Sequence, residues 1–213
     1  MQAIDGTIAV VRTKWVKAGG AMLAALVMGL ASTPAAAQFS DSYNFLKAVR
    51  DGDGTKVTDL LNKPGSTIVN TRDQSTGDAA IHIVTRRRDT TWLNFLLSRG
   101  ARADARDEAG NTPLMLAAQL GFVEGAEALI RRRGGINLAN NAGETPLIAA
   151  VQRRDIGMVR LLLTNGANAA QTDRIAGKSA RDYAAEDRRS AAILKMIDDT
   201  KAKPAAGPAG PTL

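Results

Sequence analysis

A repeat of about 33 residues is the feature that most limits what this chain of 213 residues can fold into. Gly77, Gly110, Gly143 and Gly177 lie 33, 33 and 34 residues apart, and each opens a similar segment. Apolar residues recur in step behind each glycine: Leu93, Leu96 and Leu97, then Ala126, Leu129 and Ile130, then Val159, Leu162 and Leu163, then Ile193, Met196 and Ile197. This periodicity predicts a solenoid, because each unit can cover its apolar surface only by stacking on its neighbours.

Each unit has the pattern of two short helices. Thr112 and Thr145 can cap a first helix through their hydroxyls, and the proline after each fills the first helical position, where a missing N–H costs nothing. The apolar residues behind them have i, i+3, i+4 spacing, which is typical of a second helix with one buried face. Gly100 and Gly166 then end second helices, since glycine adopts the left-handed conformation that follows a C-terminus.

Together these motifs resemble the ankyrin-repeat family. The resemblance rests on Thr-Pro-Leu at 112–114 and 145–147, Ala117-Ala118, Leu162-Leu163, and the Gly-Ala pairs at 100–101 and 166–167. It covers about residues 41 to 199. It implies an all-α solenoid of about five helix-turn-helix repeats with short β-hairpin loops.

The repeat pattern also predicts how the chain is divided. We expect a signal peptide at 1–37, an N-terminal capping repeat at 38–71, repeats at 72–104, 105–137 and 138–170, a C-terminal capping repeat at 171–199 and a disordered tail at 200–213. The first repeat is out of phase with the next, which predicts an insertion near 64–71. The tail contains proline, alanine and glycine and cannot bury a core.

Some positions depart from the pattern. Ala79-Ala80 stand where Thr-Pro is expected, so one first helix should lack a cap worth about 1 kcal/mol. Arg88, Arg133 and Arg154 stand where a glycine is expected at the end of a helix. Because of these departures, the sequence does not predict the local loop geometry, but the predicted fold is unaffected.

The first 37 residues have the pattern of a secretory signal peptide. Arg12, Lys14 and Lys17 precede an apolar run at 21–31, and alanines at 35–37 fit a cut before Gln38. An uncleaved membrane anchor is the alternative, although a span needs about 20 apolar residues. Translation could also begin nearer Met22. We therefore expect a periplasmic or secreted protein.

Composition excludes most catalytic chemistry. The chain has no cysteine and one histidine, which excludes thiolate sites, cysteine nucleophiles and multi-histidine metal sites. The resemblance implies that His82 ties adjacent loops together by hydrogen bonds; a catalytic base is the alternative, but no spacing suggests a nucleophile for it. No loop has the oxygen ligands of a calcium or magnesium site. We expect no catalytic residue, no metal and no cofactor, and hence no enzyme.

By the same resemblance, partner contacts come from the hairpin tips and from exposed positions of the first helices, which line a concave groove. At the tips these are Ser75, Thr76, Asp78, Glu108, Asn111, Asn141 and Glu144, and on the helices Arg86, Arg87, Gln119, Leu120, Gln152 and Arg153. The groove should be polar and basic with one apolar residue. As surface charges, its arginines should contribute little to folding.

The most favoured function is a monomeric protein-binding module whose partner the sequence does not identify. The alternative is an anionic envelope component, such as a lipid head group or polysaccharide, since the chain carries arginine runs at 86–88 and 131–133. Nucleic acid is not expected, because of the compartment and the lack of surface aromatics for stacking bases. Trp92 should lie in the core rather than on the binding surface.

Overall fold

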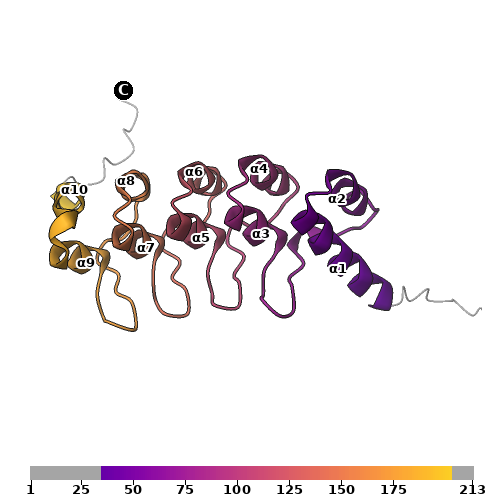
Figure 1. The fold of residues 1–213 in the computed structure, drawn as a ribbon, viewed down its shortest axis with the longest axis horizontal. Coiled ribbons are helices and arrows are strands. Elements are labelled where there is room, and N and C mark those ends of the chain that lie inside the picture. The colour runs from indigo at the N-terminus through magenta and orange to yellow at the C-terminus, as the bar shows by residue number, and fades with distance from the viewer. Residues whose placement is uncertain (1–34, 203–213) are drawn as a thin grey trace, which may run out of the picture. The chain divides into compact units, whose positions relative to one another are not determined.

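A computed structural model describes the backbone of residues 35–202 and the side chains of residues 41–200. The helices there are α1 (Ala35–Asp51), α2 (Gly54–Leu61), α3 (Ala80–Arg86), α4 (Thr90–Ser98), α5 (Pro113–Leu120), α6 (Val123–Arg131), α7 (Pro146–Gln152), α8 (Ile156–Thr164), α9 (Ala180–Glu186) and α10 (Ala191–Ala202), with short 3-10 helices at Ile68–Asn70 and Arg188–Ser190. They form five pairs that follow one another in chain order (Figure 1). The predicted all-α solenoid is confirmed.

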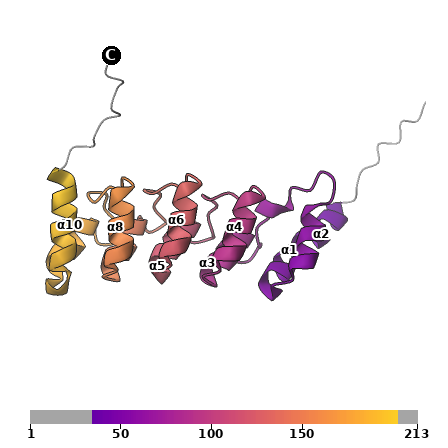
Figure 2. The same cartoon turned by 90° about the horizontal axis from the view of Figure 1, so that it is seen from above.

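First helices form one row and second helices another. The odd-numbered helices lie in the lower row of Figure 1 and the even-numbered helices in the upper row. Seen from above, the second helices lie side by side over the first (Figure 2), and each packs against the next from α4 onward. None of the helices in residues 35–202 is both long and apolar enough to span a membrane.

The loops at 71–78, 105–111, 138–144 and 171–178, which we call fingers 1 to 4, project from the row of first helices (Figure 1). Within the described residues they contain no strand, only single bridges between Arg72 and Ala79 and between Thr172 and Ser179. The predicted hairpins are thus tight loops.

One backbone hydrogen bond joins each finger to the next. The amide N–H groups of Glu108, Asn141 and Arg174 donate to the carbonyl oxygens of Thr76, Ala109 and Ala142 over 3.0, 3.0 and 2.8 Å. The donor always belongs to the later finger, so every junction has the same polarity.

The predicted caps and apolar stripe are present. Thr112 and Thr145 accept hydrogen bonds from the N–H groups of Met115 and Ile148, three residues on, over 3.2 Å in each case. Most side chains of the apolar stripe are buried, including Leu93, Leu96, Leu129, Val159, Leu162, Leu163, Ile193 and Ile197, whereas Ile130 and Met196 are half-buried. The helices therefore begin and pack where the repeat pattern predicts.

The three arginines at glycine positions keep the glycine geometry. Arg88, Arg133 and Arg154 have φ angles of +57°, +61° and +57°, in the left-handed region that Gly121 adopts in the intervening repeat. This conformation costs an L-residue roughly 1–2 kcal/mol. The guanidinium of Arg88 donates to the Leu120 carbonyl, and that of Arg154 pairs with Asp187 at 3.1 Å. Both arginines thus reach forward to the next repeat.

The ends of the repeat region differ slightly from the predicted limits. Helix α1 begins at Ala35, just before the predicted cut, and α10 continues to Ala202, beyond the predicted end of the last repeat at 199. The insertion near 64–71 contains a 3-10 helix that buries Ile68. The predicted signal peptide, up to residue 34, and the tail from residue 203 lie outside the described residues.

Candidate functional site: the fingers and the first helices

The predicted residues at the bases of the fingers are engaged within the protein. Asp78 accepts a hydrogen bond from Arg86 at 3.0 Å, and Arg86 also pairs with Asp107 at 3.0 Å. Asp107 in turn accepts from the backbone N–H of Asn111 at 2.7 Å. Glu144 accepts a longer hydrogen bond of 3.4 Å from Gln119. The finger residues in these contacts are half-buried or buried, although Arg86 is exposed, and the contacts fix fingers 1 to 3 to first helices.

The predicted residues at the finger tips are exposed. Ser75, Thr76, Glu108 and Asn141 all lie on the surface. The Ser75 backbone and hydroxyl donate to Asp73 over 2.9 and 2.6 Å, which shapes the first tip. The Asn141 side chain donates to the Glu108 carbonyl over 3.0 Å. The tips therefore present side chains on backbones held in place by hydrogen bonds.

The helix-end arginines are more engaged than expected. Arg87 donates to the carbonyl oxygens of Val49 and Arg50, at the end of α1, over 2.7 and 3.2 Å. Its guanidinium also lies 5.9 Å from the ring centre of Trp92. Arg86 and Arg87 are thus not the isolated surface charges that the sequence suggested, because both join neighbouring repeats. Trp92 itself is half-buried rather than fully in the core.

The remaining helix-end residues divide between two places. Gln119 faces finger 3, and Leu120 is half-buried against the core. Gln152 and Arg153 are exposed at the end of α7. Arg153 reaches back to the turn at Gly121, as Arg87 reaches back to α1. Arg87 and Arg153 therefore both reach back along the stack from equivalent positions, whereas Arg86 faces the fingers.

Two adjoining cavities beside finger 1 were missed by the sequence analysis. One of about 480 Å³ is lined by Ser42, Tyr43, Leu46, Arg50, Thr71, Arg72, Asp73, Gln74 and Ser75. The other, of about 350 Å³, is lined by Arg72, Asp73, Gln74, Gly77 and Glu108. Helical periodicity could have pointed to Tyr43, which is 64% exposed while Phe45, Leu46 and Val49 on the same helix are buried.

Finger 1 lines both cavities, and an ion pair holds it against α1. Asp73 accepts from the Ser75 hydroxyl and pairs with Arg50 at 2.5 Å. The Ser75 hydrogen bonds, followed by the Arg50 guanidinium, hold the pKa of the Asp73 carboxyl far below its usual range. Asp73 therefore stays ionised and joins finger 1 to α1 at any physiological pH.

His82 connects two repeats from a fully buried position. Its Nδ1 accepts from the Ala79 N–H at 3.0 Å, so its Nε2 carries the proton and donates to the carbonyl oxygens of Ala105 and Asn111 at 3.0 and 3.3 Å. The role implied by the resemblance is confirmed, and the ring also partly replaces the side-chain cap missing at Ala79. Burial lowers the pKa of His82, although Asp78 and Asp107 nearby act in the opposite direction.

We expect His82→Gln to lower the free energy of unfolding by about 1–3 kcal/mol, because buried hydrogen bonds to two loops are lost. The native histidine resists protonation, whereas the unfolded one takes up a proton below its ordinary pKa of about 6.5. Wild-type stability should therefore fall as the pH drops from 6.5 to 5.5, by at most about 1.4 kcal/mol per pH unit. Urea unfolding at both pH values measures this slope, and an equal slope in the variant would contradict the assignment.

Family models match most of the described region. One for ankyrin repeats in three copies matches residues 45–142, and one for a single ankyrin repeat matches residues 142–174. Within residues 41–200, no group of three or more His, Asp or Glu side chains is placed to hold a metal ion. Ankyrin repeats generally mediate protein–protein interactions and are generally not catalytic.

Curated proteins from distant organisms share the same repeats. A putative ankyrin repeat-containing protein of Treponema pallidum is 31% identical over 142 residues, which are 66% of this chain and 46% of that protein. Neurogenic locus notch homolog protein 2 of Homo sapiens is 32% identical over 148 residues, which are 69% of this chain and 6% of that protein. The chain spans less than half the length of either relative. With two family models that together cover residues 45–174, the chain belongs to the ankyrin-repeat family.

Proposed function

We propose that the chain is a non-enzymatic, monomeric module that is exported and binds a partner protein through its finger face. The finger face consists of the exposed tips of fingers 1 to 4, α1 around Tyr43, and the exposed ends of the first helices. The observation that carries the proposal is the pair of adjoining cavities beside finger 1, which share Arg72, Asp73 and Gln74. Together they offer a partner a hollowed surface from α1 to finger 2.

The chemistry of this face suits a protein segment. Tyr43 supplies an exposed aromatic ring at one end, and tyrosine is among the side chains most often found at the energetic centre of protein interfaces. Polar groups of both charges line the two adjoining cavities, among them Arg72 and Glu108. Such a mixture of aromatic and polar groups is typical of protein interfaces.

The fingers are also held in place before a partner arrives. Each is joined to the next by a backbone hydrogen bond, and Asp78, Asn111 and Glu144 tie their bases to the rest of the structure. A surface that is already ordered loses little conformational entropy on binding, which favours affinity. The exposed tips can thus determine which partner is bound while the bases keep their geometry.

A triple variant tests the proposal: Tyr43, Glu108 and Arg153 to alanine. All three side chains are exposed, so the melting temperature should change little. Capture of the native partner by crosslinking in cells should weaken tenfold or more, which corresponds to about 1.4 kcal/mol. Quantitative mass spectrometry of the captured protein provides the measurement.

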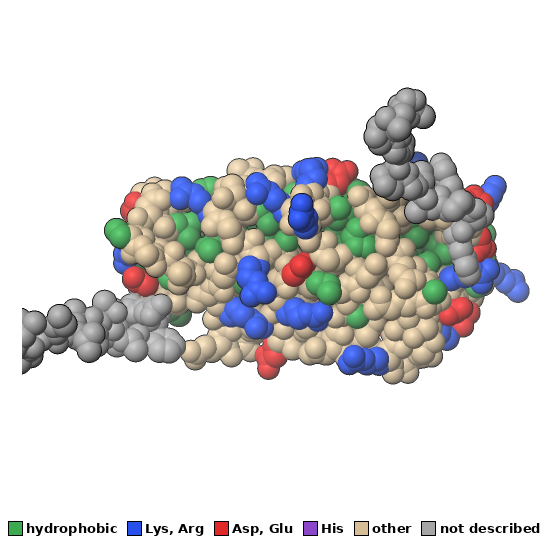
Figure 3. Space-filling view, turned by 180° about the vertical axis from the view of Figure 1, so that it is seen from behind, with side chains coloured by type: hydrophobic (Ala, Val, Ile, Leu, Met, Phe, Trp, Pro, Cys, Tyr) green, Lys and Arg blue, Asp and Glu red, His purple; other side chains and the backbone are tan. Residues whose placement is uncertain are grey.

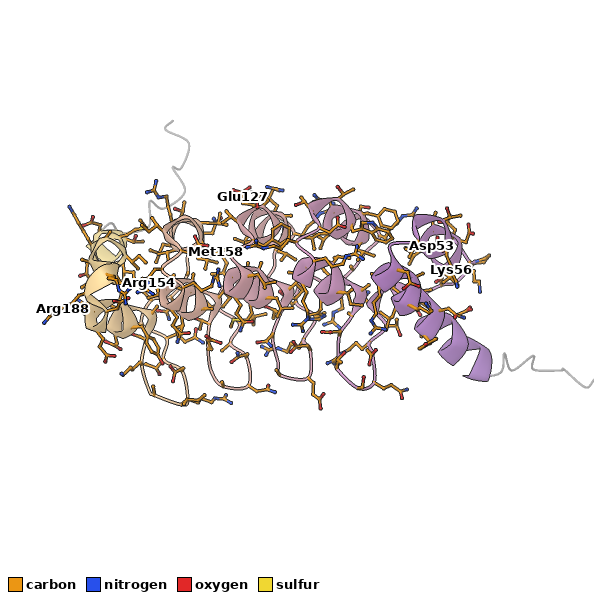
Figure 4. All side chains as sticks on the ribbon, viewed as in Figure 1. Asp53, Lys56, Glu127, Arg154, Met158 and Arg188 are labelled. Carbon is orange, nitrogen blue, oxygen red and sulfur yellow. The ribbon has the colours of Figure 1, made fainter. Side chains whose placement is uncertain are left out.

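The matched control replaces Asn94, Glu127 and Arg160 with alanine. These exposed residues occupy equivalent positions, 33 residues apart, on α4, α6 and α8, and the control removes one acid and one base, as the test variant does. Glu127 lies on the outer side of the second helices, away from the fingers (Figure 4). If the control weakens capture as much as the test variant, the finger face is not the binding surface.

Export is supported by the sequence of residues 1–37 and has its own test. Protein recovered from the periplasm should have the mass of a chain that begins at Gln38 or within a residue or two of it. A full-length mass in the membrane fraction would instead favour the anchored alternative.

A further inference from the structure

Arginines gather where the second helices of two neighbouring repeats end. We call this surface the basic end; it consists of Arg99, Arg102, Arg131, Arg132 and Arg133. Figure 3, which shows the molecule from behind, has Lys and Arg side chains gathered over the middle of the surface. Asp104 accepts a 2.6 Å hydrogen bond from the Gly135 N–H, which places the loop after α4 against the loop after α6. The arginines of the two repeats therefore belong to one surface.

The folding of these loops does not require the arginine side chains. Asn70 holds one loop by donating to the Gly100 carbonyl and accepting from the Arg102 backbone N–H, over 3.1 and 2.8 Å. Asn137 makes the same pair of hydrogen bonds in the fourth repeat, with Gly166 and the backbone of Asn168. That repeat thus builds the same loop with an asparagine in place of the arginine. Its Asn165 and Gly166 likewise stand where the third repeat has Arg132 and Arg133.

Arg133 opposes stability rather than supporting it. Three arginines adopt the left-handed conformation, and for Arg88 and Arg154 contacts with the next repeat offset the cost of that conformation. Within the described residues, no hydrogen bond or ion pair is made by the guanidinium of Arg133, nor by those of Arg102 and Arg132, while Arg131 meets Glu127 only at 3.8 Å. A strained, exposed cation without an internal partner points to a role outside folding.

We propose that the basic end binds the surface of an anionic phospholipid membrane. Guanidinium groups match phosphate oxygens with paired hydrogen bonds, and several unpaired ones lie on one surface here. The large apolar side chains exposed within residues 41–200 are Tyr43, Ile156 and Ile175, and none belongs to the basic end. A protein interface would lack its usual apolar centre at this surface, whereas a lipid headgroup layer needs none.

The choice of a membrane over other phosphate polymers rests on the proposed export, because an exported protein meets lipid surfaces rather than nucleic acid. The basic end shares no residue with the finger face, so a partner and a membrane would not compete for the same side chains. Membrane attachment would then concentrate the finger face near envelope proteins.

The test measures binding of the full chain to vesicles in a flotation assay. The assay compares vesicles of phosphatidylcholine that contain about 30% phosphatidylglycerol with vesicles of pure phosphatidylcholine. The phosphatidylglycerol gives the first set a strongly negative surface potential. The pure vesicles report any binding that does not need anionic headgroups. The test variant carries Arg102→Asn, Arg132→Asn and Arg133→Gly, each the residue of the fourth repeat at the equivalent position. The control variant replaces Arg160, Arg188 and Arg189 with asparagine and loses equal charge elsewhere.

We expect the full chain to bind the anionic vesicles at low salt and the test variant to bind about 100-fold more weakly, given about fivefold for each arginine near the surface. The control should bind within a fewfold of the unchanged chain. The melting temperature of each variant shows whether that variant is folded. The melting temperature of the test variant should not fall, because Arg133→Gly removes backbone strain.

Equal weakening by test and control variants would overturn the proposal, as would displacement of the protein from vesicles by duplex DNA at equal phosphate concentration. Because purified protein and vesicles are used, failure of export or of partner capture would not alter this result.

Discussion

Leu162→Ala is expected to lower the free energy of unfolding by about 2–5 kcal/mol, because the side chain is fully buried. Leu162 lies on α8, which packs against both α6 and α10, so the truncation leaves a cavity within the row of second helices. Neighbouring repeats provide almost all the contacts of a repeat in such a fold, and one cavity therefore weakens two interfaces. Urea unfolding followed by circular dichroism measures the change.

Ile156→Ala on the same helix is the matched comparison. Ile156 is 45% exposed, and its truncation should cost less than about 1 kcal/mol. A loss below about 0.5 kcal/mol for Leu162→Ala would mean that the register of the second helices is wrong.

Gly110→Ala should be a strongly damaging change in a finger. Gly110 has a φ angle of +79°, and a Cβ atom added there would lie 2.9 Å from the backbone nitrogen of Asn141 in the next finger. The left-handed conformation and the forced separation of two fingers together should cost about 2–5 kcal/mol. Thermal unfolding of the purified protein provides the measurement.

Gly177→Ala distinguishes the cost of the left-handed conformation from the cost of the clash between fingers. Gly177 has a similar φ angle of +65°, but a Cβ atom there meets nothing within 4 Å. Only the backbone conformation is then unfavourable, at about 1–2 kcal/mol. Equal losses in the two variants would show that contact between fingers contributes nothing to stability.

The sequence predicted those parts of the structure that repeat. Thr112 and Thr145, the apolar stripe and the left-handed position of Gly121 follow from local rules, and each recurs at a spacing of 33 or 34 residues. The same repetition located the finger tips correctly at Glu108 and Asn141. Local chemistry and stacking agree at these positions, so one sequence was sufficient to find them.

The candidate site was predicted less completely, because it depends on contacts between positions that are not equivalent. Arg87 donates to carbonyl groups at the end of α1, and no spacing within its own repeat indicates that partner. Tyr43 lies in a capping repeat that lacks the Thr-Pro motif, so its register against finger 1 could not be derived. Side-chain direction and the shape of an irregular first repeat decide such contacts.

The uniform polarity of the finger junctions makes the number of repeats adjustable. In every junction the later finger donates its N–H to the carbonyl of the earlier one, from Thr76–Glu108 to Ala142–Arg174. A tandem duplication of residues 138–170 would therefore recreate the same donor and acceptor on both sides of the inserted unit. Such an insertion lengthens the row of fingers without altering either capping repeat. Gene duplication, or a protein engineer, could thus fit the row to a longer partner while the existing junctions stay as they are.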